Sequence, residues 1–205
     1  MKKIIFLFAA FVSLLGTVGC DDDAWTTNPE WEHIYYVGFF KEVTFSDNLN
    51  YEIATDGTAR WRRNTTAWIV TGSNSISSDI PLQFHSSFTR SYDTVTYLWV
   101  TNDGSSALVE GRDYVLLDAN GNTLSPADGK YAITWPKAEK AIHNLKIKRL
   151  SEAKGVLKVN TLDPGKGTPS VTEDKYIEST LNNRTGDYEV RGLSHDFNKV
   201  TVTFN

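Results

Sequence analysis

The chain has 205 residues, a formal net charge of −4 and a single cysteine. An acidic balance of this kind lacks the basic face that nucleic-acid binding needs, and one cysteine cannot form a disulfide within the chain. With 40% hydrophobic and 12% aromatic residues, the sequence holds enough apolar side chains for one large domain or two small ones without cross-links.

The first 19 residues have the organisation of a signal peptide. Lys2 and Lys3 form a short positive region, residues 4–15 are apolar except for Ser13, and small residues precede Cys20. This apolar run is shorter than the ~20 residues that span a bilayer core. Residues 1–19 are therefore predicted to be removed as a signal peptide and not retained as a transmembrane helix.

The end of this segment, Thr17-Val18-Gly19-Cys20, resembles a lipobox, the site at which bacterial lipoproteins are acylated on the cysteine thiol and cleaved. The resemblance implies that Cys20 becomes the lipidated N-terminus of the mature chain. An ordinary signal peptide followed by a chance cysteine is the alternative. Several acyl chains on one residue suffice for stable membrane anchoring.

Three acidic residues, Asp21, Asp22 and Asp23, follow the cysteine directly. A run of like charge is by itself a solvated, flexible spacer, and residues 20–30 are predicted to form a lipidated acidic tether. The same run resembles the surface-export signal of Bacteroidetes-type lipoproteins. That resemblance implies a protein anchored in the outer membrane and facing the cell exterior.

Apolar and polar residues alternate with a period of two along the rest of the chain, which predicts half-buried antiparallel strands. The pattern is found at residues 82–85, 131–135, 145–148, 157–160, 188–191 and 199–204. Residues 34–40, 95–100 and 114–117 are apolar on both faces and are predicted to be central strands covered on both sides. Turn residues such as Asn120-Gly121 separate the strands.

Only two segments, residues 137–144 and 173–181, are candidates for short helices. Many short strands with little helix predict an all-β fold, an immunoglobulin-like antiparallel β-sandwich. We place this β-sandwich domain at residues 31–205. Residues 71–79 are the best candidate linker, so one large sandwich and two small ones divided near 71–79 both stay open.

The residue types that usually carry catalysis or bind metals do not form a recognisable group. His33, His85, His143 and His195 are scattered without metal-ligand spacing, and GxSxG and phosphate-binding glycine-rich motifs are missing. His85 and His143 fall in strand patterns and are predicted to face solvent. Residues 118–122, Asp-Ala-Asn-Gly-Asn, lack the closing glutamate of a calcium loop and are predicted to form a hairpin turn. No catalytic residue, metal site or cofactor is predicted.

The sequence contains six tryptophans, a high number for its length. An exposed indole can stack on the C–H face of a sugar, whereas a buried one fills the core. Trp99 and Trp135 lie in alternating segments and are predicted core residues. Trp61 lies between Arg60 and Arg62, a charged setting that favours exposure, with guanidinium stacking on the indole as the other explanation. Arg60, Trp61 and Arg62 are the candidate glycan-binding residues.

Residues 107–149 contain Glu110-Gly111-Arg112-Asp113-Tyr114, which resembles the "EGxDY" corner of Calx-β-like and related immunoglobulin-like sandwiches. Residues 186–205, GDYEVRGLSHDFNKVTVTFN, resemble the terminal hairpin of Bacteroidetes-type surface lipoproteins that accompany outer-membrane glycan uptake systems. Together the two resemblances cover about half of the chain. They imply a sandwich fold, a place at the cell surface and a binding or accessory role. They supply no catalytic residue, and the sequence does not show the acidic clusters of Calx-β calcium sites.

These observations predict a non-enzymatic, lipid-anchored surface protein that binds glycan or supports an outer-membrane polysaccharide uptake system. An adhesive or structural lipoprotein, linked to a pilus or binding another protein, is the first alternative, and an exposed edge strand would favour it. A glycan hydrolase is the second, and it would need two facing carboxylates. The predicted partners are the membrane, through the lipid anchor, and polysaccharide or uptake-complex proteins.

Overall fold

A computed structural model describes residues 32–39, 50–57, 59–62, 68–72, 75–167, 178–193 and 195–205. For 59–62 and 68–72 the description covers the backbone alone. Residues 34–205 form one compact unit that contains every strand named below. Cys20, Asp21, Asp22, Asp23 and the predicted signal peptide lie outside the described residues, so lipid anchoring and surface export stay predictions.

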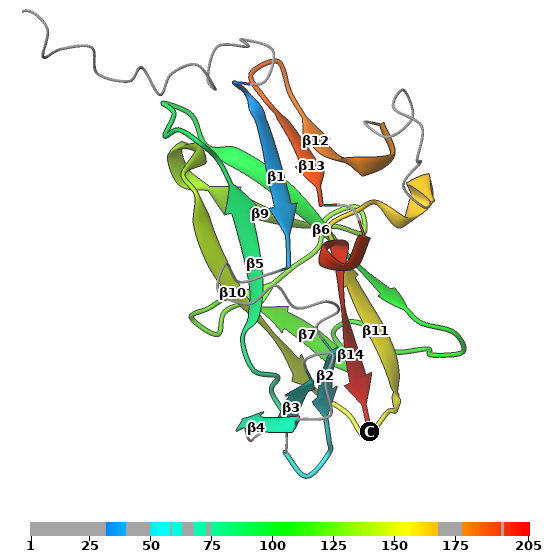
Figure 1. The fold of residues 1–205 in the computed structure, drawn as a ribbon. Coiled ribbons are helices and arrows are strands. Elements are labelled where there is room, and N and C mark those ends of the chain that lie inside the picture. The colour runs from blue at the N-terminus through cyan, green and yellow to red at the C-terminus, as the bar shows by residue number, and fades with distance from the viewer. Residues whose placement is uncertain are drawn as a thin grey trace, which may run out of the picture. The chain divides into compact units, whose positions relative to one another are not determined.

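The strands form two sheets of seven (Figure 1). The first sheet has the order β12-β13-β1-β5-β10-β7-β8, with β1 (Ile34–Gly38), β5 (Ile80–His85), β7 (Tyr114–Leu117), β8 (Thr123–Leu124), β10 (Ala141–Arg149), β12 (Leu181–Arg184) and β13 (Glu189–Gly192). The second has the order β4-β3-β2-β14-β11-β6-β9, with β2 (Asn50–Ile53), β3 (Ala59–Arg62), β4 (Trp68–Gly72), β6 (Thr94–Asn102), β9 (Tyr131–Trp135), β11 (Gly155–Asn160) and β14 (Lys199–Phe204). The short 3₁₀ turns are η2 (Pro136–Ala138), η3 (Pro164–Lys166) and η4 (His195–Asn198).

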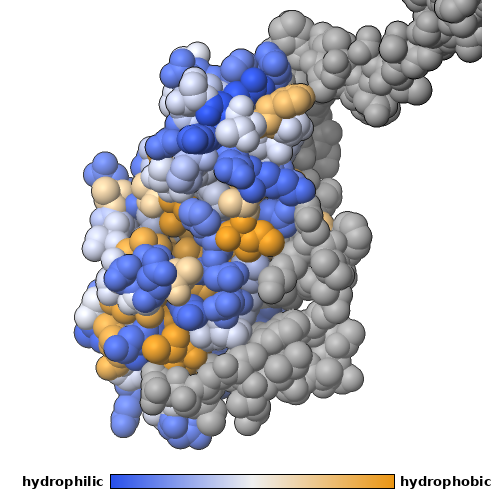
Figure 2. Space-filling view, turned by 90° about the vertical axis from the view of Figure 1, so that its left-hand side faces the viewer, coloured by the Kyte–Doolittle hydropathy of each residue, from blue (hydrophilic) through white to orange (hydrophobic). Residues whose placement is uncertain are grey.

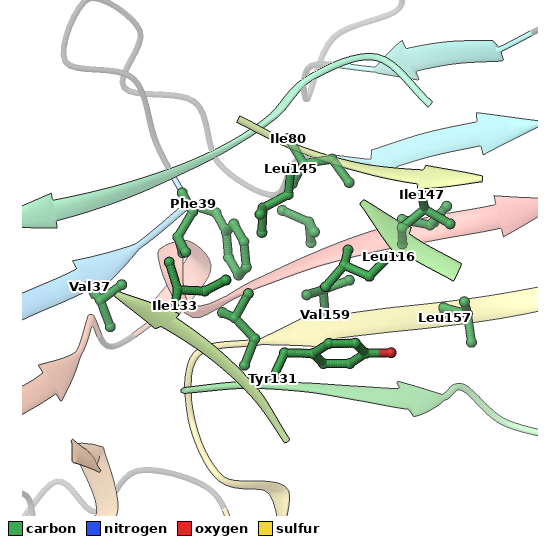
Figure 3. Packing of buried hydrophobic residues seen from close by; sticks show 14 of the residues in the cluster. Val37, Phe39, Ile80, Leu116, Tyr131, Ile133, Leu145, Ile147, Leu157 and Val159 are labelled. Atoms are coloured by element: carbon green, nitrogen blue, oxygen red, sulfur yellow. The ribbon is translucent and has the colours of Figure 1, made fainter. Parts of the chain in front are cut away.

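The buried hydrophobic residues of these strands form one cluster between the two sheets (Figure 3). Its composition follows from the alternation in the sequence, because successive side chains of a strand point to opposite faces. In β14, for example, Val200, Val202 and Phe204 are buried while Lys199 is exposed. Burying each such side chain stabilises the fold by about 1.5–3 kcal/mol. The predicted all-β sandwich is confirmed.

The sheets are mixed and not purely antiparallel. Of the twelve strand pairs in the described part of the chain, β1 with β13 and β2 with β14 run parallel, and the other ten run antiparallel. Alternation reports which face of a strand is buried and says nothing about the direction of its neighbour. The strands near the N-terminus are therefore joined to those near the C-terminus by a pairing that the sequence pattern could not indicate.

The prediction of a helix at residues 137–144 is wrong. Pro136 starts a single 3₁₀ turn that ends at Ala138, and β10 begins at Ala141. Ala141, His143 and Leu145 face the core in alternation, so pairing with β5 decides the backbone conformation over local helix propensity. Of the second candidate, residues 178–180 form one helical turn and residues 173–177 lie outside the description.

Strand β5 is buried on both faces, although its sequence alternates between apolar and polar residues. Leu82 and Phe84 are buried in the core, and Gln83, predicted to face solvent, is only 1% exposed. The strand lies between β1 and β10, well inside the first sheet. The polar character of Gln83 therefore does not indicate a solvent-exposed face of β5.

The candidate linker at residues 71–79 crosses from one sheet to the other. Gly72 ends β4 in the second sheet and Ile80 starts β5 in the first. Within the crossing, Ser77 N donates to Ile147 O and Ser77 Oγ accepts from Ile147 N, each at 2.9 Å. This part of the segment is therefore attached to β10.

Candidate functional site

The residues predicted to bind glycan lie in β3 of the second sheet. The register pairs Arg60, Trp61 and Arg62 with Glu52, Tyr51 and Asn50 of β2. The side chains of β3 are outside the description, so a ligand role for these three residues stays a prediction. Their strand nevertheless belongs to the same sheet as a second aromatic group, which lies on β6.

Tyr97 and Trp99 of β6 lie on the outer face of the second sheet. Thr96 and Leu98, the two neighbours of Tyr97 in the strand, are fully buried, so the rings of Tyr97 and Trp99 point away from the core and are half-exposed. The rings meet edge to face with centroids 6.3 Å apart. The prediction that Trp99 is a core residue is therefore wrong.

A different tryptophan explains why Trp99 is outside. Trp135 of β9 is fully buried, as predicted, and its indole Nε1 donates to Thr96 Oγ1 at 2.9 Å. A buried indole N–H needs an acceptor, and the inward threonine of β6 supplies it. The inner face of β6 is thus occupied by small hydroxyl residues opposite Trp135, which leaves its large aromatics on the outer face.

Lys130 lies over the ring of Tyr97. Its Nζ is 3.8 Å from the ring centroid, well within the range of a cation–π interaction. Lys130 is held there by the turn before β9, in which Asp128 and Gly129 both have positive φ and Ala127 bridges to Lys130. No carboxylate of the described residues lies within 4.0 Å of its ammonium group. The turn therefore sets the position of Lys130, and the ring of Tyr97 is the contact that its half-exposed ammonium group makes among the described residues.

Asn160 and Lys199 continue the row that starts at Trp99. The register places Asn160 of β11 beside Trp99, and Lys199 of β14 beside Asn160. Asn160 Nδ2 donates to Trp99 O, Thr101 Oγ1 and Lys158 O at 3.1–3.3 Å. Asn160 is half-exposed, and none of the described residues donates a hydrogen bond to its Oδ1.

The neighbouring row carries an ion pair. Lys158 Nζ donates to Asp103 Oδ1 at 2.7 Å, and this hydrogen bond lowers the pKa of Asp103 below its ordinary value. Both groups are partly exposed, so the pair adds little to stability. The ion pair neutralises Asp103 and Lys158 against each other, so neither group is left without a counter-charge on this face.

Side chains from the first sheet hold the edge of β6 beyond the end of β11. Asn182 Oδ1 accepts from Tyr97 N, and its Nδ2 donates to Tyr97 O, both at 2.8 Å. Asn183 Nδ2 donates to Val95 O, and Val95 N donates to the Tyr188 hydroxyl. These side chains make the hydrogen bonds that a neighbouring strand would otherwise make to β6. They therefore fix the backbone of Val95 and Tyr97.

His143 lies on the inner side of β10, contrary to the prediction that it faces solvent. Its ring is stacked on Trp135 with centroids 4.1 Å apart, and Trp135 in turn is stacked on Phe84. Burial lowers the pKa of His143 below its ordinary value, which favours the neutral form of the imidazole. This environment is that of a packed core residue.

The Glu110–Tyr114 motif forms a structural corner. Gly111 has φ +76°, and its N–H donates to Tyr114 O at 2.8 Å. The buried carboxylate of Asp113 accepts from Val109 N, from Nε and Nη2 of Arg112 and from Ser151 Oγ. The Arg112 guanidinium holds the pKa of Asp113 well below its usual range. The motif therefore ties β7 to the end of β10.

Residues 118–122 form the predicted hairpin turn between β7 and β8. The carboxylate of Asp118 accepts from Asn120 N, Asn122 N and Asn122 Nδ2, which also lowers its pKa. Its oxygens are thus committed to the turn itself. Within the described ranges there is no group of three histidine, cysteine or acidic residues able to hold a metal ion.

The large exposed hydrophobic side chains of the described residues are Tyr36, Phe88, Val109, Ile142 and Leu150. Figure 2 shows one side of the molecule, on which hydrophobic residues are interspersed with hydrophilic ones. Single exposed apolar residues are normal and need no ligand to explain them. None of the helical segments described in the structure is long and apolar enough to cross a membrane.

The outer face of β6 was not predicted as a site. One signal was present, because Tyr97 and Trp99 alternate with Thr96 and Leu98 in the sequence. The alternation was interpreted as a strand covered on both sides, since aromatic residues are usually the buried ones. The contribution of Lys130 depends on the pairing of β6 with β9, which brings together residues about thirty positions apart.

Comparisons with known proteins add little. No family model matches the sequence, and no curated protein sequence matches it. Among solved structures, the chain is similar to the N-terminal domain of PorA, with 8% sequence identity and a TM-score of 0.28. The match covers 83% of this chain and 97% of that one. A TM-score this low carries no argument.

Proposed function

We propose that this protein is a non-enzymatic, lipid-anchored surface protein that binds glycan on the outer face of its second sheet. The observation that carries the proposal is the half-exposed pair Tyr97 and Trp99, next to half-exposed Asn160. Aromatic rings stack on the apolar C–H faces of sugars, and amide and hydroxyl groups beside them bind sugar hydroxyls. The hydrogen bonds that fix the edge of β6 also support glycan binding, because aromatic rings that are already ordered lose little conformational entropy when a ligand binds.

The cellular part of the proposal rests on the sequence. Acylation of Cys20 anchors the mature chain in the outer membrane, and Asp21, Asp22 and Asp23 direct it to the cell exterior. There it acts as a glycan-binding or accessory component of a polysaccharide uptake system. The proposal is for binding without turnover, so hydrolysis of a bound polysaccharide by the purified protein would overturn it.

Glycan binding is tested by affinity pull-down and calorimetry of the mature protein against a panel of polysaccharides. Replacing Trp99 with alanine removes the stacking surface and is expected to weaken binding about tenfold, since stacking of one ring is worth about 1–2 kcal/mol. Tyr36→Ala is the matched control, because Tyr36 is an exposed aromatic on the first sheet. Absence of binding to every polysaccharide would refute the proposal.

Variants of β3 distinguish the two candidate positions on the second sheet. Arg60 and Arg62 occupy the register positions beside Glu52 and Asn50, and Trp61 the position beside buried Tyr51. If the ligand extends along the outer face from β6 to β3, Trp99→Ala weakens binding and so does a variant with alanine at both Arg60 and Arg62. If only Trp61→Ala does so, the site lies at β3, as the sequence predicted, and the role proposed for Tyr97 and Trp99 is wrong.

Anchoring and export are tested in the native cells. Mass spectrometry is expected to find a diacylglyceryl thioether on Cys20 as the first residue, and Cys20→Ala releases the protein from the membrane fraction. Protease treatment of intact cells is expected to remove the wild-type protein and to spare a variant in which Asp21, Asp22 and Asp23 are alanine. An unmodified Cys20 would remove the basis for the cellular placement.

An adhesive or structural role is the second candidate, and the position of β9 favours it. β9 ends the strand order of the second sheet, and the described residues pair with it only on the β6 side. A strand with one open edge is a site at which a partner strand can add. Cross-linking on intact cells would favour this role if it recovered a protein neighbour through β9 with no dependence on sugar.

A further inference from the structure

We infer that the glycan bound by the outer face of the second sheet is an acidic one, a polymer carrying carboxylate or sulfate groups. The inference rests on the proposed glycan-binding function and narrows its ligand class. It is drawn from the cations of this face and from their position beside Trp99.

The first observation is the environment of Lys130. Its ammonium group lies over the ring of Tyr97, 3.8 Å from the ring centroid. The ring orders the lysine but satisfies none of its three N–H donors, and no carboxylate of the described residues lies within ion-pair distance. An ordered ammonium next to an open indole fits a sugar that stacks on Trp99 and places an anionic group at Lys130.

The second observation is the row from Trp99 through Asn160 to Lys199. Lys199 is exposed and makes no ion pair with any described residue. Two strand spacings, about 10 Å, separate β6 from β14. Trp99 thus lies between two cations, Lys130 on the β9 side and Lys199 on the β14 side. A polymer with a charge on each repeating unit reaches both while one of its rings covers the indole.

The third observation is the charge balance of this face. Across β2, β14, β11, β6 and β9, with the residues that flank β6 and the residue before β9, its described cations are Lys130, Lys158 and Lys199, and its described acids are Glu52, Asp93 and Asp103. Asp103 is already bonded to Lys158 at 2.7 Å. These described charges balance, but Lys130 and Lys199 lie in the row of Trp99, whereas Asp93 and Asp103 lie at the two ends of β6. Since screening limits charge effects to about 8 Å at physiological salt, the local groups decide which ligand is preferred.

The inference is tested by calorimetry with four acidic polymers: polygalacturonate, alginate, hyaluronate and chondroitin sulfate. Each is measured beside its own neutral derivative, carboxyl-reduced or desulfated, and beside neutral glucans and xylans. At least one acidic polymer is expected to bind about tenfold more tightly than its neutral derivative, with affinity falling as salt rises from about 50 to 500 mM. Single-stranded DNA of equal charge density is the polyanion control.

The outcomes separate the two proposals. Binding to neutral polymers alone, or equal binding to an acidic polymer and its neutral form, overturns the acidic ligand and leaves glycan binding intact. Binding to no polysaccharide overturns both. Equal affinity for DNA overturns the inference too, because the face would then recognise charge without sugar.

Variants of the two cations link the preference to this face. Lys130→Ala is expected to reduce affinity for the acidic polymer about fivefold and to leave any binding of its neutral derivative unchanged. Lys130→Arg restores the preference, because a guanidinium also lies over tyrosine and bonds carboxylate or sulfate. Lys148→Ala is the matched control, since Lys148 is an exposed lysine of the first sheet. An equal loss with Lys148→Ala would show that only net charge matters and would contradict the inference.

Discussion

Two charged regions of this molecule treat their charges in opposite ways. At the end of the sandwich, the guanidinium of buried Arg149 donates to the carbonyl oxygens of Ile53, Ser151, Ala153 and Asn205 at 2.7–2.8 Å. The nearby Asp113 is equally enclosed, and Ser151 connects the two groups. On the outer face of the second sheet, neither Lys130 nor Lys199 has a described carboxylate within ion-pair distance, although the charge of Lys199 contributes to lowering the pKa of Asp103.

The difference separates structure from recognition. A buried charge is tolerated only when the protein supplies its hydrogen bonds, so its removal is felt as lost stability. An exposed charge that the protein leaves to solvent adds little to stability and stays available to a ligand. Mutations at Arg149 and Asp113 are therefore expected to lower stability in denaturation experiments. Mutations on the outer face of the second sheet are expected to change ligand affinity in binding experiments.

The largest effect is expected at Arg149. Arg149→Met keeps most of the apolar volume but leaves four carbonyl oxygens without their donor, and is expected to lower the free energy of unfolding by about 3 kcal/mol. Urea denaturation measures this. Lys148→Met, at the exposed neighbouring position of β10, is the control and is expected to change stability by no more than about 0.5 kcal/mol.

Asp113 is expected to give the next largest effect, with a defined pH dependence. Its folded pKa is depressed, chiefly by Arg112, so its contribution to stability is present above the unfolded pKa of about 4 and is lost as pH falls toward the folded pKa. At pH 7, Asp113→Asn melts at a lower temperature than wild type. The gap in Tm is expected to close below about pH 4. A gap that stayed constant down to pH 2 would mean that the carboxylate charge is irrelevant.

Asn182 connects the two regions of the comparison, since it is buried but supports the outer face. Asn182→Ala removes bonds to Tyr97 N, Tyr97 O and Thr161 O and is expected to cost about 2 kcal/mol of stability. It should also weaken glycan binding, because the backbone below the rings loses its support. Asn120→Ala, in the exposed β7–β8 turn, serves as the control for both measurements.

A smaller effect is expected at Gly111, whose φ of +76° strains any other residue. Gly111→Ala meets no steric contact within 4 Å and is therefore expected to cost about 1 kcal/mol through the backbone alone. Gly186, also open to solvent but without positive φ, is the matched position. Gly186→Ala is expected to be neutral or slightly stabilising, and equal losses at both sites would contradict the backbone explanation.

The smallest effect on stability is expected at Lys130. Lys130→Ala removes one partly exposed cation–π contact, worth about 0.5 kcal/mol, and should leave the denaturation midpoint nearly unchanged. Differential scanning calorimetry on the samples used for binding measures this. A large loss of stability would mean that Lys130 has a structural role like that of Arg149 and Asp113. It would contradict the distinction between charges that stabilise the fold and charges that are available to a ligand.

The strands and the core were largely predictable, because alternation depends only on neighbours in the sequence. Val200, Val202 and Phe204 illustrate this, as does the hairpin closed by Asp118. Gln83 was misplaced because its burial depends on which strands flank β5. The faces of Trp99 and His143 were likewise decided by Trp135, which bonds to Thr96 on one side and stacks on His143 on the other.

The candidate site was less predictable than the fold, for a physical reason. The outer face combines side chains from β6, β9, β11 and β14, which are adjacent only after both sheets have formed. Lys130 gave no sign in the sequence of its contact with Tyr97. In the sequence, Asn182 and Asn183 of β12 resemble ordinary turn-forming residues. Their neighbours in the sequence give no sign that the two amides form hydrogen bonds to the backbone of β6 in the other sheet. The β3 residues were singled out on local charge alone.

The parallel pairing of early with late strands has a consequence for how the molecule can be made. β1 joins the first sheet beside β13, and β2 joins the second beside β14. A chain that is synthesised from its N-terminus cannot complete either sheet until its final strands have also been made. Such long-range closure slows folding, and during that interval the emerging β1 and β2 would need protection from pairing with other chains.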